Sequence, residues 1–196
     1  TIETLFKRAE EKLTSQMLCK VEHKMVELKA RVNTLDLIRG KIIDLKAHHI
    51  GTFKQVDVYF EVPEGRLKLR EVEGKNTVEL VYYKRENVSG PKRSDVFILE
   101  VQEPAVFKSL LEKVLKTGVT VEKLREVYRY QGTQIHLDTV KKLGVFVEFE
   151  RETTADLQAI RKNQQTLKGL MKKLGIKTEN LEKLSYSDLI QKCNQK

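Results

Sequence analysis

The chain contains no run of about 18 uncharged apolar residues, which excludes a membrane-spanning helix. The amino terminus, Thr1-Ile2-Glu3-Thr4, lacks the basic and apolar regions of a signal peptide. There are only two cysteines, Cys19 and Cys193, and their spacing fits neither a metal site nor a redox motif. Together these absences predict a protein of a reducing, cytoplasmic compartment that does not contact a membrane.

Proline is scarce, and the sequence has neither repeats nor low-complexity stretches. Three prolines in 196 residues are too few to mark a linker, and this length suits one sizeable domain. Residues 2–18 carry apolar side chains at helical spacing. We therefore expect a helical extension over residues 1–20, which packs or self-associates, and one domain over residues 21–196 that is helical from about residue 153. Self-association through the extension leaves a homodimer open.

The chain is basic, with 37 Lys and Arg against 28 Asp and Glu and a net charge of +9. Such an excess favours an anionic partner, although an ordinary lysine-rich surface explains the count equally well. No stretch interleaves aromatic with basic residues as a single-strand binding platform does, which disfavours nucleic acid. The position of the charges must decide between these alternatives.

Strand-like alternation dominates the chain between short helical patterns. Period-two patterns predict eight strands, at about residues 26–32, 55–60, 66–72, 78–85, 94–101, 120–129, 134–139 and 145–150. Helical spacing predicts helices after the N-cap Thr34, from Pro104 to Gly118, from Leu157 to Gly175 and from Ser185 or Ser187, the first with Leu37, Ile38, Ile42 and Leu45 on its packing side. The expected fold is α+β, an eight-stranded antiparallel closed barrel with surrounding helices. Eight strands close a barrel that is wide enough for side chains or one small ligand.

Several predicted strands carry charges of one sign on one face. Arg66, Lys68 and Arg70 share a face, and so do Glu148 and Glu150. Like charges side by side in a sheet repel each other, and a surface that serves only solubility mixes both signs. The segregation indicates that the basic rows face phosphates and that the acidic row faces a divalent cation.

Other strands extend this set of charged faces. Further rows are Glu27-Lys29-Arg31, Glu79 with Arg85, Lys123-Arg125-Arg129, and His136 with Asp138. Each row alone also fits a solvated face, and His136 alone fits a structural or surface histidine. If all of them line one barrel, a dry interior is excluded, because unpaired buried charge costs several kcal/mol per ion. A wet cavity that binds a polyanion with Mg²⁺ or Mn²⁺ satisfies these charges.

The order of these motifs resembles the CYTH (adenylyl cyclase–thiamine triphosphatase) superfamily over residues 25–174, and most closely its class IV adenylyl cyclase-like subgroup. The motifs are Val26-Glu27-Leu28-Lys29-Ala30-Arg31, Asp57, Gly65-Arg66-Leu67-Lys68-Leu69-Arg70, Tyr82-Tyr83-Lys84-Arg85, Gly90-Pro91-Lys92-Arg93-Ser94-Asp95, His136-Leu137-Asp138 and Leu143-Gly144-Val145-Phe146-Val147-Glu148-Phe149-Glu150. Each motif is weak alone, and their combination is specific.

The resemblance implies a triphosphate tunnel, in which basic side chains hold the phosphates and carboxylates hold Mg²⁺ or Mn²⁺. The implied phosphate-binding residues are Lys29, Arg66, Lys68, Arg85, Lys123 and Arg125, of which Lys29 and Arg125 are catalytic, with Arg31, Arg70 and Arg93 as weaker candidates. The implied metal ligands are Glu27, Glu148 and Glu150, with Asp138 as a helper.

One position departs from the superfamily pattern. The opening motif of the superfamily is Glu-x-Glu-x-Lys, and Met25 stands at its first acidic position. A thioether does not replace a carboxylate on Mg²⁺, so either one ligand is missing or Glu22 or Asp57 supplies it.

The resemblance implies three alternative functions. The first is metal-dependent hydrolysis of a nucleoside triphosphate, thiamine triphosphate or tripolyphosphate. The second is cyclisation of ATP to cyclic AMP and pyrophosphate, in which the ribose 3′-hydroxyl replaces water as the nucleophile. The third is a module that binds nucleotide or polyphosphate without catalysis, which the loss of acid at Met25 favours.

Overall fold

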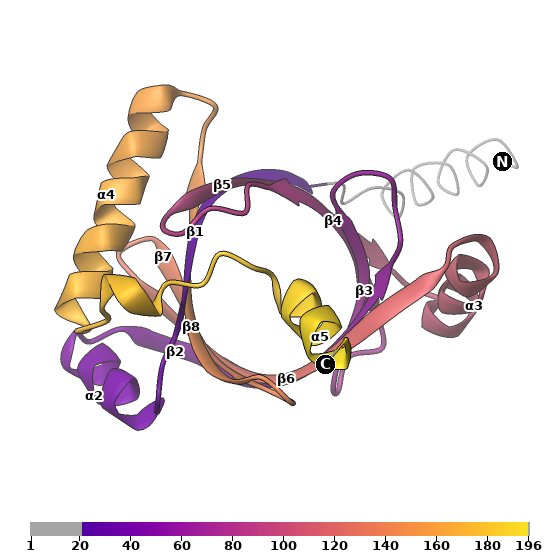
Figure 1. Ribbon diagram of the computed structural model, residues 1–196, viewed down its shortest axis with the longest axis horizontal. Helices are drawn as coiled ribbons and strands as arrows, with labels where there is room; N and C mark the ends of the chain where they lie inside the picture. The colour runs from indigo at the N-terminus through magenta and orange to yellow at the C-terminus, as the bar shows by residue number, and fades with distance from the viewer. Residues whose placement is uncertain (1–20, 196) are drawn as a thin grey trace, which may run out of the picture.

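The computed structural model describes residues 21–195, in which eight antiparallel strands form a closed barrel (Figure 1). The strands are β1 (Val21–Arg31), β2 (His48–Phe60), β3 (Arg66–Val72), β4 (Val78–Arg85), β5 (Lys92–Val101), β6 (Thr117–Tyr130), β7 (Thr133–Val140) and β8 (Gly144–Thr153). The helix expected over residues 2–18 lies outside the described residues. The predicted fold class and the eight predicted strands are confirmed.

The strand order around the barrel is β1-β5-β4-β3-β2-β6-β7-β8, and pairing of β1 with β8 closes it. In this closing pair Lys29 lies opposite Glu148, and Glu27 lies opposite Glu150. The two strands that carry most of the predicted metal ligands are therefore neighbours. This adjacency joins residues that are more than 100 positions apart in the sequence.

The longest strands exceed their predicted bounds. β2 begins at His48 rather than at about residue 55, and it pairs with β6 along nearly its whole length. Residues 48–54 lack a clear apolar alternation, so the sequence pattern alone does not mark them as a strand. Backbone hydrogen bonds to β6 supply the stabilisation that the local pattern lacks.

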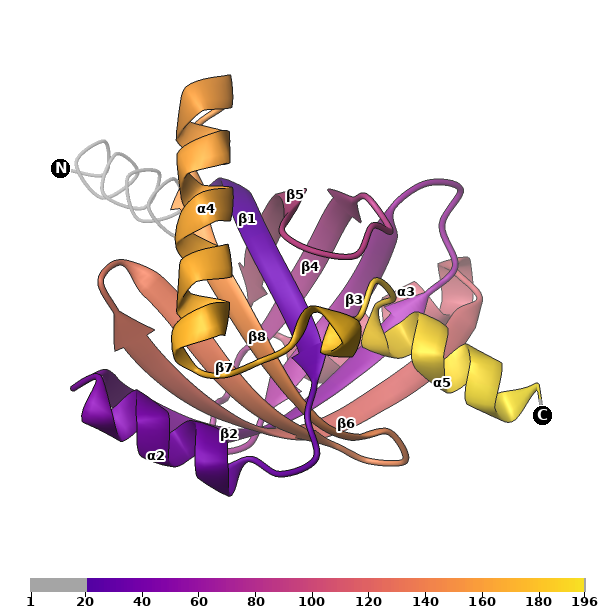
Figure 2. The same ribbon diagram turned by 60° about the vertical axis from the view of Figure 1, so that its left-hand side comes forward.

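Three helices cover the outside of the barrel, and the fourth, α5 (Tyr186–Asn194), lies at its mouth (Figures 1 and 2). The three are α2 (Asp36–Asp44), α3 (Pro104–Val114) and α4 (Leu157–Lys173), and a short 3₁₀ helix lies at Thr178–Asn180. α2 and α4 lie on one side of the barrel and α3 lies on the other (Figure 1). Within residues 21–195, no helix is both long enough and apolar enough to cross a bilayer.

The apolar core lies between the outer face of the barrel and these helices. Val147 and Phe149 of β8 are fully buried against Leu167 and Leu170 of α4. On the opposite side, Leu69 of β3 packs in a second cluster with the α3 helix. Most apolar side chains of these strands point outward into the two clusters, so the side chains that alternate with them, most of them polar, point into the barrel.

The helix boundaries agree with the sequence signals except in α2 and at the end of α3, which stops at Val114, whereas Gly118 lies in β6. Leu35 precedes the first helical turn, and the Thr34 hydroxyl accepts a hydrogen bond from the Asp36 amide (3.3 Å) rather than capping the helix at its predicted position. Leu37 is 71 % exposed, although the helical spacing predicts it on the packing side. α2 has only nine residues, and its contact with the barrel is narrow enough for Ile38 and Ile42 to fill it.

A glycine marks the end of α4, and a serine marks the start of α5. After α4, Gly175 takes a left-handed conformation (φ 71°), which lets its amide and that of Ile176 bond to the last helical carbonyls. Ser185 and Asp188 form a reciprocal capping box at the start of α5. This confirms Ser185 as the start signal and directs the next residue, Tyr186, toward the barrel.

Packing of α4 on the barrel gives a stability prediction. Leu167→Ala should lower the free energy of unfolding by about 2–5 kcal/mol, because Leu167 is fully buried and its truncation leaves a cavity. Leu157→Ala on the same helix is the matched control and should change it by no more than about 0.5 kcal/mol, because Leu157 is 67 % exposed. Urea denaturation measures both, and equal losses would contradict this packing.

Candidate functional site

The barrel encloses a polar cavity of about 360 Å³, to which all eight strands contribute side chains. Lys68, Arg70, Glu148 and Glu150 line this one cavity, as the sign-segregated alternation predicts. The cavity also receives Glu27, Lys29, Arg85, Lys123, Arg125 and His136. Most of the predicted charged faces are therefore brought together in the interior, although Arg129 at the end of β6 is exposed and does not line the cavity.

Asp57 holds three of the cavity's cations in place. Its carboxylate accepts hydrogen bonds from Lys68 (2.9 Å), Arg70 (2.7 Å) and Lys123 (3.2 Å), and it is 1 % exposed. Although burial opposes the charged form, Arg70, Lys123 and Lys68 hold the pKa of Asp57 well below its usual range. A fixed anion among three cations keeps the basic wall rigid while leaving it a net positive charge.

Burial also changes the protonation of the cavity lysines. It lowers the pKa of Lys68 to about 7, and Arg70 acts in the same direction while Asp57 opposes the shift. Burial lowers the pKa of Lys92 to about 8. It also lowers the pKa values of Lys29 and Lys123, and in all three lysines it is the largest cause of the shift. These ammonium groups would regain stabilisation if a polyanion entered the cavity.

Arg125 forms the second charged cluster. Its guanidinium donates two hydrogen bonds to Asp138 (2.7 and 2.6 Å) and a third to Glu148. The Tyr186 hydroxyl from α5 also donates to Asp138 (2.8 Å). Both oxygens of Asp138 are thus engaged and the residue is fully buried, so Asp138 is placed to orient Arg125.

Glu148, Glu150 and His136 form a group whose ligand atoms all lie within 4.8 Å of one another. Burial opposes ionisation of Glu148, but Lys29 and Arg125 hold its pKa well below the usual range. Burial raises the pKa of Glu150. Burial lowers the pKa of His136 to about 3, so its imidazole is neutral at physiological pH. One neutral nitrogen and two carboxylates are a donor set that fits a divalent cation.

Glu27 and Arg85 lie next to this group. The Arg85 guanidinium donates a hydrogen bond to Glu27 through Nη1, while its buried Nε and Nη2 have no hydrogen-bond partner among the described residues. Buried donors without partners are rare in folded proteins and indicate a missing acceptor. An anion in the cavity would supply that acceptor.

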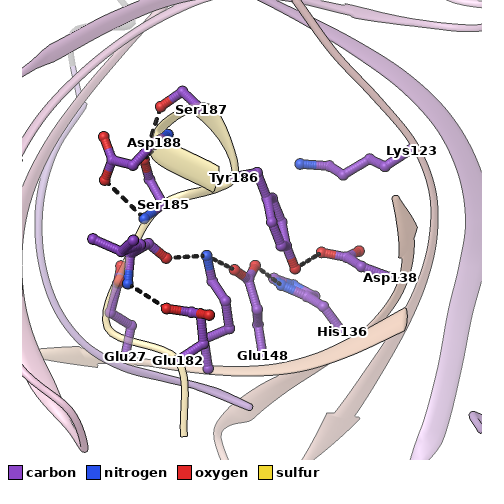
Figure 3. A network of polar contacts seen from close by, with 12 residues as sticks. Glu27, Lys123, His136, Asp138, Glu148, Glu182, Ser185, Tyr186, Ser187 and Asp188 are labelled. Atoms are coloured by element: carbon purple, nitrogen blue, oxygen red, sulfur yellow. Dashed lines mark hydrogen bonds and ion pairs between the residues drawn. The ribbon is translucent and has the colours of Figure 1, made fainter. Parts of the chain in front are cut away.

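The C-terminal segment lies at one end of the barrel (Figures 1 and 3), where its Ser185 and Tyr186 line the cavity. Lys29 donates a hydrogen bond to the carbonyl oxygen of Leu184 (3.0 Å) and forms an ion pair with Glu148 (3.3 Å). The ammonium of Lys29 also lies 3.8 Å from the centre of the Tyr186 ring. Lys92, which is 1 % exposed, donates to the carbonyl oxygen of Lys183 (3.1 Å). Main-chain carbonyl oxygens of the segment before α5 thus accept hydrogen bonds from two buried lysines.

A second cavity of about 660 Å³ lies beside α5 and shares Tyr59 and Arg85 with the first. Arg66 lines this outer cavity and donates a hydrogen bond to Asp188 of α5 (2.8 Å). The basic row of β3 is therefore divided, with Lys68 and Arg70 in the barrel interior and Arg66 at its mouth.

Some sequence predictions need correction. Arg31 is exposed and donates to the carbonyl of Leu143, because it lies at the last position of β1, where the barrel wall ends. Arg93 pairs with Asp95 on the outer face of β5, since its neighbours Lys92 and Ser94 are the buried ones. Neither arginine lines the cavity.

The predicted substitutes for Met25 do not join the acidic group. Asp57 is held by its three cations, and Glu22 is exposed and accepts from Lys24. Asp138, predicted as a helper ligand, is occupied by Arg125 and Tyr186 and is likewise outside the group. Glu27 lines the same cavity but is paired with Arg85.

Three residues of the site were missed by sequence reasoning. His136 had a signal, since it alternates in phase with Asp138, but a lone histidine on a strand is most often structural. Lys92 falls just before the strand predicted at residues 94–101, although it is in phase with Ser94 on β5. Tyr186 had no signal, because nothing local shows that α5 enters the mouth of the barrel.

Comparisons with known proteins agree with this geometry. A family model described as CYTH domain matches residues 23–186. A Methanocaldococcus jannaschii protein, MJ0240, whose name proposes an adenylate cyclase, is 23 % identical over 173 residues, which cover 84 % of this chain and 97 % of that protein.

Solved structures show the same fold. The Pyrococcus horikoshii protein PH1012 has a TM-score of 0.75 and 27 % identity, covering 84 % of this chain and 98 % of the other. The proposed adenylyl cyclase HpAC1 from Hippeastrum, for which a dominant triphosphatase activity is reported, has a TM-score of 0.62 and 18 % identity, covering 90 % and 97 %.

Proposed function

The chain belongs to the CYTH family, and from this premise we propose that it binds a triphosphate compound in the barrel and hydrolyses it with a divalent metal ion. The observation that carries the proposal is the buried guanidinium of Arg85, whose Nε and Nη2 lack partners among the described residues. It faces the same cavity as Lys68, Lys123 and Arg125. A linear triphosphate offers several anionic oxygens in a row and suits such a wall.

In phosphoryl transfer, the protein mainly positions the reacting groups and stabilises the charge on the phosphate oxygens. Arg85, Lys68 and Lys123 hold the phosphate chain. Lys29 and Arg125 stabilise the charge that develops on the reacting phosphate, and Asp138 orients Arg125. Glu148 and Glu150 would hold the metal, with Glu27 beside them. When bound, the metal polarises a phosphate oxygen or lowers the pKa of a water molecule.

Cyclisation of ATP is the second candidate. The name of the M. jannaschii relative supports it, and so does the outer cavity of about 660 Å³, which adjoins the tunnel and has room for a nucleoside. The triphosphate would occupy the same tunnel in both reactions. The difference is the nucleophile, which is water in hydrolysis and the ribose 3′-hydroxyl in cyclisation.

Incubation with ATP, thiamine triphosphate or tripolyphosphate, each with Mg²⁺ or Mn²⁺, distinguishes the candidates. Chromatography of the products should show release of inorganic phosphate from at least one substrate. Formation of cyclic AMP and pyrophosphate from ATP would establish the cyclase instead. Binding without turnover of any of the three would identify a non-catalytic module and overturn the proposed reaction.

Protonation of the tunnel lysines predicts that triphosphate affinity depends on pH. The pKa of Lys68 is about 7 in the free protein, and a bound polyanion raises it. Below pH 7, Lys68 is already charged. Above pH 7, binding must take up a proton, so affinity should fall several-fold between about pH 7 and pH 9.

Calorimetry of tripolyphosphate binding in two buffers of different ionisation enthalpy measures this proton uptake. Lys68→Arg is the matched control, because its guanidinium stays charged throughout this range. The variant should take up fewer protons and lose affinity less steeply with pH. The same steep loss in Lys68→Arg would assign the pH dependence to another group.

A further inference from the structure

His136 lies between the two carboxylates of the acidic group. His136 is on β7 directly opposite Glu148 of β8. Gln134, two residues earlier on the same face of β7, is opposite Glu150. The Nδ1 atom of His136 is 3.7 Å from Glu150 and 4.0 Å from Glu148. The residue is only 4 % exposed, so the register of two strands, rather than a mobile loop, aims the ring at this point.

The hydrogen bond of the other ring nitrogen determines the tautomer. Nε2 of His136 lies 3.3 Å from Oε1 of Gln134, and an amide oxygen only accepts hydrogen bonds. Nε2 therefore carries the proton, and Nδ1 presents its lone pair. A metal-bound histidine typically donates its remaining N–H to an oxygen acceptor in this way.

Among residues 21–195, no donor pairs with the lone pair of Nδ1. Nδ1 is buried and lacks a hydrogen-bond partner among the described residues. Within the same part of the chain, the ion-pair contact of Glu150 is with the His136 ring alone, and no Lys or Arg lies within ion-pair distance of it. When Glu150 is ionised, its half-buried carboxylate and the buried nitrogen lone pair of His136 face each other as two acceptors, and a cation satisfies both.

We propose that Nδ1 of His136 is a ligand of the divalent cation held by Glu148 and Glu150, and that this nitrogen makes the site select a first-row transition-metal ion over Mg²⁺. The proposal rests on the metal dependence proposed above for the same site. Mg²⁺ prefers oxygen ligands, whereas imidazole favours the transition metals. His136 also supplies a third donor without the carboxylate that Met25 replaces.

Mn²⁺ alone, added to the whole protein without substrate, is the probe. Pulsed electron paramagnetic resonance should detect nitrogen coupling from the bound Mn²⁺, and the coupling should change when the histidines are labelled with ¹⁵N. His136→Phe should abolish the nitrogen coupling. The variant should also weaken Mn²⁺ binding by about 10–100-fold, because Mn²⁺ loses a nitrogen ligand. Mg²⁺ binding should change by less than about threefold, because a water molecule replaces the lost ligand on Mg²⁺ at little cost.

Two further variants keep the test independent of the stability of His136→Phe. Gln134→Met leaves the histidine in place but removes the acceptor of its Nε2–H, and should weaken Mn²⁺ binding by about 10-fold. His23→Phe removes another cavity histidine, which pairs with Glu152, and should leave the nitrogen coupling unchanged.

The outcomes separate this proposal from the proposed function. Mn²⁺ binding that lacks nitrogen coupling, or nitrogen coupling that survives in His136→Phe, would overturn the role of His136 and leave metal-dependent hydrolysis intact. No binding of Mn²⁺ or Mg²⁺, with or without tripolyphosphate, would overturn the metal dependence itself.

Discussion

Glu150→Gln should reduce metal-dependent turnover of the triphosphate by about 100-fold or more while leaving the fold intact. A neutral amide is a poor replacement for a carboxylate on a hard cation. A bound metal contributes several kcal/mol of charge stabilisation in the transition state, and each 1.36 kcal/mol changes the rate about tenfold. Burial raises the pKa of Glu150, which means that the fold penalises its charge. Removing that charge should therefore preserve or increase thermal stability in metal-free buffer.

Glu148→Gln is the informative partner of this variant. Its carboxylate forms ion pairs with Lys29 and Arg125, both of which are buried. The variant should lose turnover to a similar degree and also lose stability, by up to about 3–5 kcal/mol, because breaking a buried pair leaves an uncompensated charge.

The sign of the pH dependence differs between the two carboxylates. The pKa of Glu148 lies below its unfolded value, so Glu148 contributes stability above the unfolded pKa, and this is lost as the pH falls through the lower folded pKa. The pKa of Glu150 lies above its unfolded value, so its contribution is present at low pH and is lost as the pH rises through the folded pKa. Thermal melts between pH 3 and pH 8 and steady-state turnover measure both effects. Equal stability losses in the two glutamine variants would contradict the different environments of these residues.

Met25→Glu complements these variants. Met25 lines the same cavity and lies opposite Glu152 in the β1–β8 pairing. A restored carboxylate should tighten metal binding if the site lacks a ligand. An unchanged affinity would mean that the donors already present are sufficient.

Arg85→Lys should weaken tripolyphosphate binding by at least about tenfold, although it preserves the positive charge. Lysine keeps an ion-pair partner for Glu27 but loses the two buried guanidinium donors that have no partner among the described residues. Hydrogen bonds to charged groups contribute about 1.5–3 kcal/mol, which corresponds to roughly 10–150-fold in affinity.

Calorimetry at near-physiological salt measures the tripolyphosphate affinity of Arg85→Lys, and two further variants serve as comparisons. Lys172→Ala on the exposed face of α4 is the matched control and should change affinity less than twofold, because exposed charges are screened. Arg66→Ala should weaken binding by a similar factor to Arg85→Lys only if the ligand also contacts the outer cavity. Equal, small losses at all three positions would indicate a diffuse electrostatic surface and contradict a specific tunnel.

Arg125→Ala would be a poorer test of ligand binding than Arg85→Lys. Arg125→Ala would leave Asp138 and Glu148 buried without their shared cation. A loss of affinity in that variant would therefore mix ligand binding with unfolding. Arg85 avoids this problem because lysine can still pair with Glu27.

The amino-acid sequence by itself determined the barrel and the inward direction of most charged rows. Strand alternation has a period of two, so each residue's face follows from its own neighbours, and this placed Lys68, Arg70, Glu148 and Glu150 in one interior. The same local rule failed at strand ends. Arg31 is in phase with Lys29, yet it lies where the wall of the barrel stops.

Only the tertiary structure decided which charges meet. Asp57 reaches Lys68 and Lys123 because β2 lies between β3 and β6 in the closed sheet, and no local pattern encodes that order. Likewise, the entry of α5 into the mouth of the barrel brings Tyr186 to Asp138, which is 48 residues away in the chain. Whether a charged side chain is paired or left available for a ligand depends on such long-range neighbours, because in this cavity burial and the nearest charges together set its pKa and its hydrogen bonds.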